Sequence, residues 1–201
     1  MDKRISRKFF NDRAEHWDET VRNNDPQKLR SMADRLNINK DDRVLDVGTG
    51  TGVFIPHIAE KLNGGGKIIS MDYAINMLYK ANAKFPQNGS LRYVCAEIET
   101  LHMNSEAFDV ATCYSTFPHF HDKPKALSNL RHLLRSNGIL YICHTAGRET
   151  INDIHRNIPD FQDHLIPDNA SMVQLLKDAG FTDISIEDDS ESYLVQARNG
   201  A

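Results

Sequence analysis

Apolar positions along the chain follow two different periods, one typical of buried strands and one typical of helices. Short, nearly continuous apolar runs occupy residues 43–47, 67–72, 91–95, 108–114 and 138–144. Between them, apolar residues recur every three to four positions over residues 53–62, 74–85 and 124–136. Regular alternation of such segments predicts an α/β fold with a doubly wound, mostly parallel sheet that is covered by helices on both faces.

The two ends of the chain depart from this alternation. Near the N-terminus, residues 7–21 place apolar side chains on one face of a predicted first helix, and Asp25 and Pro26 supply the N-cap and the first-turn proline of a second. Near the C-terminus, residues 181–198 contain two strand-like runs joined by a short turn with no helix between them. They predict an antiparallel hairpin at one edge, which brings the sheet to seven strands.

Charge and cysteine content narrow the classes of partner and compartment. The 201-residue chain has a net charge of -4 with acidic and basic residues interspersed, so we expect neither nucleic acid nor a membrane surface as a partner. No apolar run reaches the roughly eighteen residues of a membrane span, and the segment MDKRISRKFF is charged where a secretory signal is apolar. The three cysteines are widely spaced, which favours reduced thiols. These features predict a cytoplasmic protein.

The segment VLDVGTGTGVF, residues 44–54, has three glycines at alternate positions directly after the first predicted strand. Ligands of open α/β sheets bind beyond the carboxyl ends of the strands, and glycine lets a ligand approach the backbone. Gly48, Gly50 and Gly52 therefore predict a ligand-binding loop, with a structural tight turn as the alternative. Val53 stands where a dinucleotide fingerprint has glycine, and a P-loop lysine is missing, which disfavours an NAD-dependent oxidoreductase or an NTPase.

Three acidic residues follow predicted strands at the same edge of the sheet. Asp72 ends the second strand, where a carboxylate can accept both hydroxyl hydrogens of a ribose. Asp46 ends the first strand and can face an ammonium group, while Glu97 follows the third and can accept from an adenine amino group. Taken singly, each also fits a turn residue, a loop cap or an exposed acid. Together they predict a ligand with an amino group, a ribose and an adenine, and with little phosphate.

These segments resemble the class I S-adenosylmethionine-dependent methyltransferases, especially the subgroup around the ubiquinone and menaquinone C-methyltransferases. The resemblance rests on VLDVGTGTG, IISMDYAINML, YVCAEIETLHMNSEAFDVATCYSTFPHF, ALSNLRHLLRSNGILYI and LLKDAGFTDISI, which span most of residues 43–187. The chain departs from the family where Ala96 and Glu97 replace a Gly-Asp pair and where Pro118 and His119 replace a histidine pair. The resemblance implies a Rossmann-like fold, S-adenosylmethionine as cofactor and S-adenosylhomocysteine as product.

The resemblance also assigns cofactor contacts. It implies that the glycine loop holds the methionine part, that Asp72 holds the ribose and that Glu97 holds the adenine amino group. Met77 and Ile98 are expected against the faces or the edge of the adenine. The full predicted cofactor set is Asp46, Gly48, Thr49, Gly50, Gly52, Asp72, Tyr73, Met77, Glu97, Ile98 and Tyr114.

We expect a single methyltransferase domain over residues 1–201. Its predicted parts are an N-terminal lid helix (1–23), a cofactor-binding core (43–144), an acceptor-side segment (145–170) and a C-terminal helix with the hairpin (171–198). The first helix resembles the segment that closes over the cofactor in this family, although an apolar stripe fits core packing equally well. The short acceptor-side segment favours a small-molecule acceptor, and the sequence is compatible with a monomer and with a homodimer.

Methyl transfer from a sulfonium is an in-line displacement, for which alignment in a dry pocket supplies much of the acceleration. A base is needed only where the acceptor is protonated at rest. We predict His119, Tyr114 and His144 as catalytic residues because they lie at or after the ends of two neighbouring strands, with His119 at the family position beside the transferred methyl group. The predicted acceptor-pocket residues are Arg148, Glu149 and His155.

A second interpretation comes from a concentration of possible metal ligands. They are Cys113, His119, His121, Cys143, His144 and His155, and Cys and His are the usual ligands of zinc. Because neighbours on a strand point to opposite faces, Cys143 and His144 do not both ligate one ion, and we predict no metal. The alternative to an enzyme is a metal- or metabolite-binding protein that keeps the S-adenosyl pocket as a regulatory or vestigial site.

Overall fold

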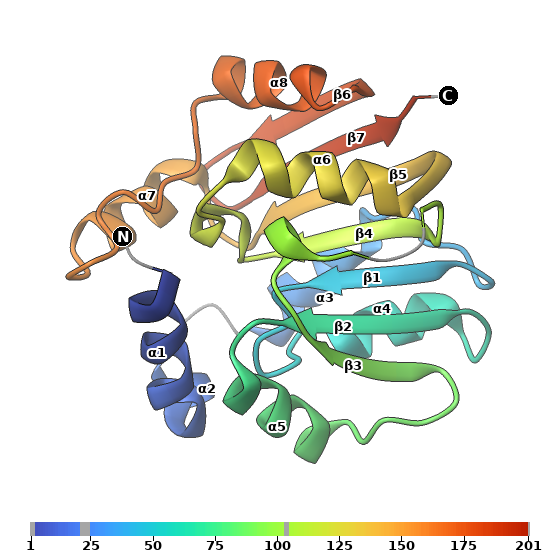
Figure 1. Cartoon of the computed structure of the whole chain (residues 1–201), viewed down its shortest axis with the longest axis horizontal. Helices are drawn as coiled ribbons and strands as arrows, with labels where there is room; N and C mark the ends of the chain where they lie inside the picture. The colour runs from blue at the N-terminus through green and yellow to red at the C-terminus, as the bar shows by residue number, and fades with distance from the viewer. Residues whose placement is uncertain (1–2, 21–24, 103–104, 201) are drawn as a thin grey trace.

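A computed structural model describes residues 3–20, 25–102 and 105–200, and its centre is a seven-stranded sheet (Figure 1). The strands are β1 (Arg43–Val47), β2 (Lys67–Asp72), β3 (Leu91–Cys95), β4 (Phe108–Tyr114), β5 (Leu134–His144), β6 (Phe181–Asp188) and β7 (Tyr193–Asn199). Their spatial order is β3-β2-β1-β4-β5-β7-β6. The chain reverses its direction of strand addition between β1 and β4, which is where open α/β sheets bind ligands.

All strands of the sheet except β7 run in the same direction. Leu45 of β1 pairs with Ile69 of β2 and with Ala111 of β4, so β1 is flanked on both sides. β7 pairs antiparallel with both β5 and β6 and lies between them, which leaves β6 as the outer strand of the hairpin. The predicted α/β fold, with its mostly parallel sheet and its hairpin edge, is confirmed.

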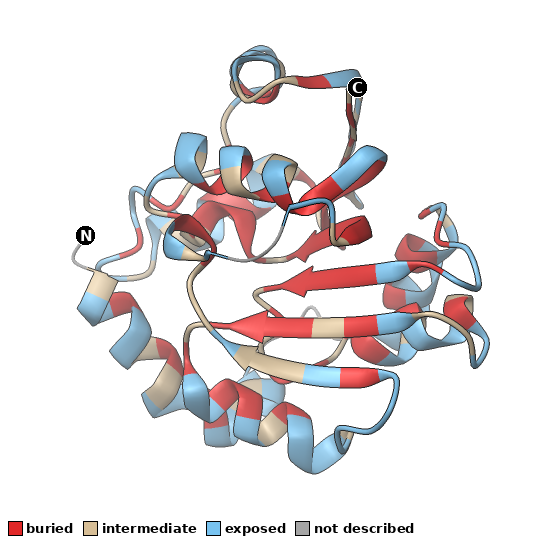
Figure 2. Ribbon diagram, turned by 45° about the vertical axis from the view of Figure 1, so that its right-hand side comes forward, coloured by how far each residue is buried: buried red, intermediate tan, exposed pale blue. Residues whose placement is uncertain are grey.

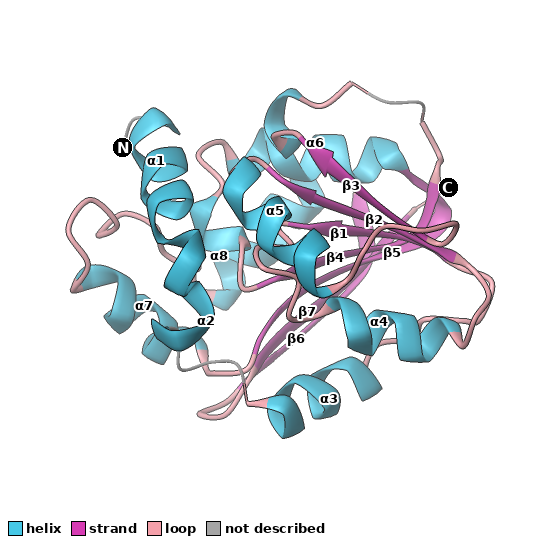
Figure 3. Ribbon diagram, turned by 90° about the horizontal axis from the view of Figure 1, so that it is seen from below, coloured by secondary structure: helices cyan, strands magenta, loops and turns pink. Residues whose placement is uncertain are grey.

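Helices cover both faces of the sheet because neighbouring strand residues point to opposite sides. The helices of the two layers are α3 (Pro26–Asp34), α4 (Ile55–Leu62), α5 (Ile75–Lys84), α6 (Lys123–Leu133) and α8 (Asn169–Asp178). Leu45 belongs to the apolar core under α6 and α8, whereas its neighbour Val44 belongs to the core under α3 and α4. Figure 2 shows buried residues along the strands and exposed residues on the outer helix faces. Figure 3 shows the sheet between α6 above and α3 and α4 below.

A third group of elements lies beyond the carboxyl ends of the parallel strands (Figure 1). It consists of α1 (Lys3–Arg13), a short 3-10 helix η1 (Ala14–His16), α2 (Trp17–Thr20) and α7 (Arg148–Arg156). Phe10 and Ala14 pack with Met77 of α5 and with Phe161, which follows α7. These elements form a small core of their own, and it faces the end of the sheet where the glycine loop lies.

Two local predictions near the N-terminus have different outcomes. The predicted single helix over residues 7–21 is interrupted by η1, and residue 21 lies outside the described residues. The predicted N-cap is confirmed, because the side chain of Asp25 accepts the backbone N–H of Gln27 at 2.9 Å directly before the helix that starts at Pro26. None of the helices in the described part of the chain combines the length and the apolar character that crossing a bilayer requires.

Candidate active site

The loop between β1 and α4 holds three glycines in the left-handed region. The φ angle is +68° at Gly48, +55° at Gly50 and +83° at Gly52. A Cβ atom at Gly48 would lie 2.0 Å from Oγ1 of Thr116, so the backbone approach there requires glycine. At Gly50 the same atom would meet nothing within 4 Å, whereas at Gly52 it would touch side chains of α4 and α5. The middle glycine therefore faces open space, and the last one packs a helix against the loop.

The carboxylate of Asp72 ties the glycine loop to the end of β2. Its Oδ2 accepts the N–H of Gly50 at 2.9 Å, and its Oδ1 accepts the N–H of Ala74 at 2.8 Å. Each oxygen keeps a further lone pair for a ligand. Burial raises the pKa of Asp72 to about 6, with a smaller contribution from the charge of Asp46, although hydrogen bonds from backbone N–H groups act in the opposite direction. The carboxylate lies in the wall of a cavity, where it can accept hydroxyl hydrogens from a ligand.

Asp46 lies beneath the glycine loop and not in the cavity wall. The side chain is 1 % exposed, and its Oδ1 accepts a hydrogen bond from Oγ1 of Thr112 at 3.0 Å. Burial raises its pKa to about 6. Its Oδ2 has no hydrogen-bond partner among the described residues. The predicted contact of Asp46 with an ammonium group stays a prediction.

A cavity of about 490 Å³ opens beyond the strand ends, a size typical of small-molecule sites. The predicted site residues that line it are Gly48, Thr49, Gly50, Asp72, Tyr73, Met77, Tyr114, His119 and His144. Its opposite wall comes from α1, α2, α7 and the segment after α7. Glu97 and Ile98 line an adjoining recess of about 30 Å³ that shares part of this wall. Of the predicted set, Asp46 and Gly52 line neither space.

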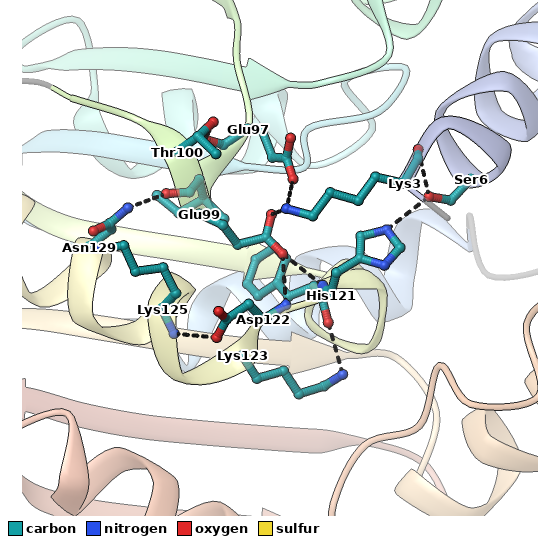
Figure 4. Close-up of polar contacts among 12 residues, drawn as sticks. Lys3, Ser6, Glu97, Glu99, Thr100, His121, Asp122, Lys123, Lys125 and Asn129 are labelled. Carbon is teal, nitrogen blue, oxygen red and sulfur yellow. Dashed lines mark hydrogen bonds and ion pairs between the residues drawn. The ribbon is translucent and has the colours of Figure 1, made fainter. Parts of the chain in front are cut away.

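Helix α1 is fastened to the recess by ion pairs (Figure 4). Nζ of Lys3 reaches between Glu97 and Glu99 and pairs with both carboxylates. Nη2 of Arg7 lies 3.5 Å from Oε2 of Glu97. Glu99 is held from the other side, since its Oε1 accepts the N–H of His121 at 2.7 Å. Glu97, the residue predicted to accept from an adenine amino group, therefore faces two cations of α1.

Histidine side chains from the 3-10 helix η3 (Phe117–His119), α7 and the segment after α7 gather at one side of the cavity. Nδ1 of His119, in η3, lies 3.0 Å from Nδ1 of His164. The ring of His155, on α7, is centred 4.9 Å from the ring of His119. Burial lowers the pKa of His119 and of His155, and it lowers that of His164 to about 4. These imidazoles are therefore neutral at pH 7.

His144 and Tyr114 complete this wall from the ends of β5 and β4. His144 is 1 % exposed, and neither ring nitrogen has a hydrogen-bond partner among the described residues. Burial lowers its pKa to about 3. The ring of Tyr114 stacks on Phe54 at 4.7 Å, and its hydroxyl lies 2.9 Å from Oγ1 of Thr145. Burial raises the pKa of Tyr114 to about 12, so the phenol stays protonated at neutral pH.

The predicted acceptor-pocket residues separate in space. His155 lines the cavity, but Arg148 and Glu149 do not. Nε of Arg148 lies 3.1 Å from Oδ2 of Asp188, so its guanidinium faces the end of β6. His164 was missed at the sequence level, because the segment between α7 and α8 has no periodic pattern that marks it. Among the described residues, no three His, Cys, Asp or Glu side chains are grouped so that they can hold a metal ion.

Comparison with known proteins supports this description of the fold and the loop. The methyltransferase domain family matches residues 45–142. Phosphoethanolamine N-methyltransferase 1 of Arabidopsis thaliana is 25% identical over 84% of this chain and 34% of its own length. The ubiquinone/menaquinone biosynthesis C-methyltransferase UbiE of Wigglesworthia glossinidia brevipalpis is 31% identical over 52% of this chain and 43% of its own length. The chain thus spans less than half the length of these two relatives.

A solved structure extends the likeness to nearly the whole chain. The structure of a SAM-dependent methyltransferase from Aquifex aeolicus matches with a TM-score of 0.73 and 20% identity, covering 94% of this chain and 97% of that one. At this identity the match concerns the fold. It agrees with the domain match over residues 45–142 and with the glycine loop at the point where the strand order reverses. Residues 45–142 match a methyltransferase domain, and the chain resembles the class I S-adenosylmethionine-dependent methyltransferases, in particular their ubiquinone/menaquinone C-methyltransferase-like subgroup.

Proposed function

We propose that this protein transfers the methyl group of S-adenosylmethionine to a small-molecule acceptor. The observation that carries the proposal is a single cavity with two unlike walls. One wall consists of the glycine-loop backbone and Asp72, and the other consists of apolar side chains and imidazoles. A ligand on the first wall is thereby held within the same space as a ligand on the second, as a transfer reaction requires.

The cofactor residues are assigned on the fit between the loop and the ligand. We assign the methionine part to the backbone of Gly48, Thr49 and Gly50, because open space faces the middle glycine. Asp72 is assigned to the ribose hydroxyls, and its two spare lone pairs support this role. The adenine contacts are assigned to Tyr73, Met77, Glu97 and Ile98, which lie in the cavity wall or the adjoining recess. When bound, the cofactor supplies a methyl group that is activated by its sulfonium.

The protein itself contributes alignment and the exclusion of water. Phe10 and Trp17 cover the cavity from the N-terminal side, and Phe161 covers it from the segment after α7. A dry, preorganised site favours displacement at a methyl carbon, where positive charge is lost from sulfur. We propose that residues 3–20 act as the lid; residues 1–2 and 21–23 of the predicted lid lie outside the described residues.

The predicted catalytic residues are proposed to contact the acceptor. Tyr114 keeps its proton at neutral pH, which suits a hydrogen-bond donor. His144 has two unpaired ring nitrogens in the wall, and His119 lies beside it in the same cavity. If the acceptor is protonated at rest and His119 is its base, His119→Ala lowers turnover by about a hundredfold; for an acceptor that is already nucleophilic, the change is small.

Three measurements test the proposal. Titration calorimetry is expected to show one S-adenosylhomocysteine site per chain, and tight NADH binding without S-adenosylhomocysteine binding would refute the cofactor. Incubation with S-adenosylmethionine and a fractionated metabolite extract is then expected to yield S-adenosylhomocysteine. Tight cofactor binding without turnover in every fraction favours the regulatory or vestigial alternative. Native mass spectrometry of the purified protein identifies any bound cofactor or metal directly.

Two further proposals concern the class of binding partner and the cellular location of the protein. We propose a small molecule as the only acceptor class. We propose no nucleic-acid partner, because the net charge is -4 and acidic and basic residues are interspersed along the chain. A cytoplasmic location stays a prediction from the charged N-terminal segment. Cell fractionation with an antibody against the protein tests it, and recovery in a secreted or membrane fraction would contradict it.

A further inference from the structure

The acceptor side of the cavity is almost free of charge. Its walls are formed by the apolar side chains of Phe9, Phe10, Trp17, Ile151, Ile154 and Phe161. Among the described lining residues, only Asp72 and Arg13 carry a charge at neutral pH. Asp72 lies at the glycine loop, and the guanidinium of Arg13 lies over the ring of Phe9 at 3.8 Å. Because an unpaired charge is costly in an apolar site, this wall selects a neutral acceptor.

Polar groups on this side come mainly from three neutral imidazoles. His119, His144 and His155 all line the cavity. Both ring nitrogens of His144 are buried without a partner among the described residues. A neutral imidazole has an N–H donor on one nitrogen and a lone pair on the other, so each nitrogen calls for a ligand atom that can accept or donate a hydrogen bond. A hydroxyl or a thiol on the acceptor meets this requirement.

The tautomer of His155 follows from its hydrogen bond. Nδ1 of His155 lies 2.5 Å from the backbone carbonyl oxygen of His164. A carbonyl oxygen only accepts, so Nδ1 carries the proton and Nε2 of the neutral ring carries the lone pair. Within the described chain Nε2 has no hydrogen-bond partner, and it is not among the fully buried atoms. Nε2 is therefore an available proton acceptor on a residue that lines the cavity.

His119 differs from His155 in this respect. Its Nδ1 faces another imidazole nitrogen, Nδ1 of His164, at 3.0 Å. Either ring can donate in that contact, so the contact leaves the tautomer of His119 open. Of these two rings, His155 is therefore the one whose hydrogen bond fixes which nitrogen carries the lone pair. The titratable groups around it are His119, His144, His164 and Lys123, and none of them is an acid that would hold a second proton on the ring.

We propose that the acceptor is a neutral, largely apolar molecule that carries a weakly acidic hydroxyl or thiol, and that His155 is the base that removes its proton. This inference rests on the proposed methyl transfer. The acceptor oxygen or sulfur forms a bond to the methyl carbon, the carbon–sulfonium bond breaks, and its electron pair stays on the sulfur of S-adenosylhomocysteine. The acceptor proton moves to Nε2 of His155. His164 acts as a positioning residue through its backbone carbonyl.

A spectroscopic experiment tests the tautomer without turnover. Two-bond ¹H–¹⁵N correlation spectra of the ¹⁵N-labelled protein at pH 7 are expected to show a neutral His155 ring with the proton on Nδ1. Addition of phenol to the protein saturated with S-adenosylhomocysteine is expected to shift the Nε2 resonance. A proton on Nε2, or a ring that responds to benzoate or benzylammonium but not to phenol, overturns the proposal.

A kinetic experiment tests the proton transfer with two acceptor probes at pH 8. Phenol is largely protonated there, since a phenolic hydroxyl has a pKa of about 10, whereas 4-nitrophenol is largely ionised. Because its charge weakens binding in a neutral site, each variant is compared with the wild type at saturating concentrations of each probe. His155→Gln is expected to lower S-adenosylhomocysteine release with phenol by about a hundredfold and with 4-nitrophenol by less than about fivefold. The matched variant His132→Gln, at an exposed position outside the cavity, is expected to leave both rates unchanged.

The outcomes separate this inference from the proposed function. Equal losses with both probes in a folded His155→Gln protein show that His155 does not act as a base, although methyl transfer itself stands. Faster methylation of benzoate or benzylamine than of phenol overturns the neutral acceptor class. Failure of the wild-type protein to bind S-adenosylhomocysteine in calorimetry contradicts the proposed function instead.

Discussion

The two walls of the cavity are built in different ways. The cofactor wall uses backbone groups of a loop directly after β1 and one carboxylate at the end of β2, residues that are close in sequence or at equivalent strand ends. The acceptor wall uses side chains of α1, η3, α7 and the segment after α7, which are far apart along the chain. The first wall is charged and hydrogen-bonded to the backbone, and the second is neutral and apolar. The first therefore depends on backbone geometry and the second on tertiary packing.

The largest effect is expected from a variant that disrupts the backbone geometry of the cofactor wall. In Gly48→Ala, the new Cβ would lie 2.0 Å from Oγ1 of Thr116, and the residue would have to keep φ at +68°. Left-handed strain costs about 1–2 kcal/mol, and overpacking adds about 1–3 kcal/mol. We expect the free energy of unfolding to fall by about 3 kcal/mol in urea denaturation, with loss of S-adenosylhomocysteine binding.

Gly50→Ala separates ligand contact from protein packing. Its Cβ would meet no protein atom within 4 Å, so only the strain of φ +55° is expected in the free protein. A ligand against Gly50 would still meet the added methyl group, so the affinity should fall further than the stability. Gly64→Ala is the matched control, with φ +81° and the same open surroundings outside the cavity. Equal binding losses in the two variants would refute the contact at Gly50.

Asp72→Ala is expected to have the next largest effect. The variant removes the proposed acceptor of the ribose hydroxyls and also the anchor of the Gly50 N–H. We expect cofactor binding to weaken by about 1.5–3 kcal/mol, the range for a hydrogen bond to a charged group. Titration calorimetry with S-adenosylhomocysteine measures the change. An unchanged dissociation constant in a folded protein would remove Asp72 from the ribose site.

The pH dependence of binding sharpens the contrast between the walls. Because burial raises the pKa of Asp72 to about 6 and hydroxyl donors favour the ionised carboxylate, cofactor affinity is expected to be constant above pH 6 and to fall up to about tenfold per unit below it. Asp46 also has a pKa of about 6 but lies outside the wall. Calorimetry of Asp72→Asn between pH 5 and 8 isolates the contribution of Asp72. If the affinity of this variant depends on pH as strongly as that of the wild type, the titration belongs to Asp46.

Much of the fold and of the cofactor wall was predictable from the sequence. Continuous apolar strands and helical periodicity are local patterns, and they gave the sheet and its hairpin edge. Asp72 was found because strand ends of a parallel sheet meet at one edge. The break of the first helix at Ala14–His16 was not predicted, because the apolar spacing continues through it and the interruption depends on packing against α5.

The acceptor wall was less predictable for a physical reason. His155 was assigned to the pocket from its helix, but Arg148 on the same helix pairs with Asp188 of a strand more than thirty residues away. His164 has no sequence signature. Its Nδ1 comes close to Nδ1 of His119 only because the segment after α7 folds back toward η3. The contact of Lys3 with Glu97 likewise joins residues 94 positions apart. Such long-range side-chain pairs follow from the finished fold and not from local spacing.

The smallest expected effect concerns the link between the two walls. Lys3 ties α1 to Glu97 and Glu99 beside the cofactor recess, but its side chain is 39% exposed. A partly exposed ion pair contributes at most about 1 kcal/mol, so Lys3→Gln is expected to change cofactor affinity by less than about fivefold. Faster amide hydrogen exchange in α1 should accompany this change, because the helix loses its fastening.

Lys8→Gln provides the matched control for this variant. It removes the pair of Lys8 with Asp12, which lies on the same helix but on its exposed side, with the lysine side chain 74% exposed. Exchange in α1 should change less in this variant than in Lys3→Gln, and cofactor affinity should not change. If both variants behave alike, α1 is held by its aromatic packing and Lys3 is not its fastening. If Lys3→Gln strengthens cofactor binding, Lys3 competes with the adenine for Glu97. The ion pair then opposes cofactor binding and does not support it.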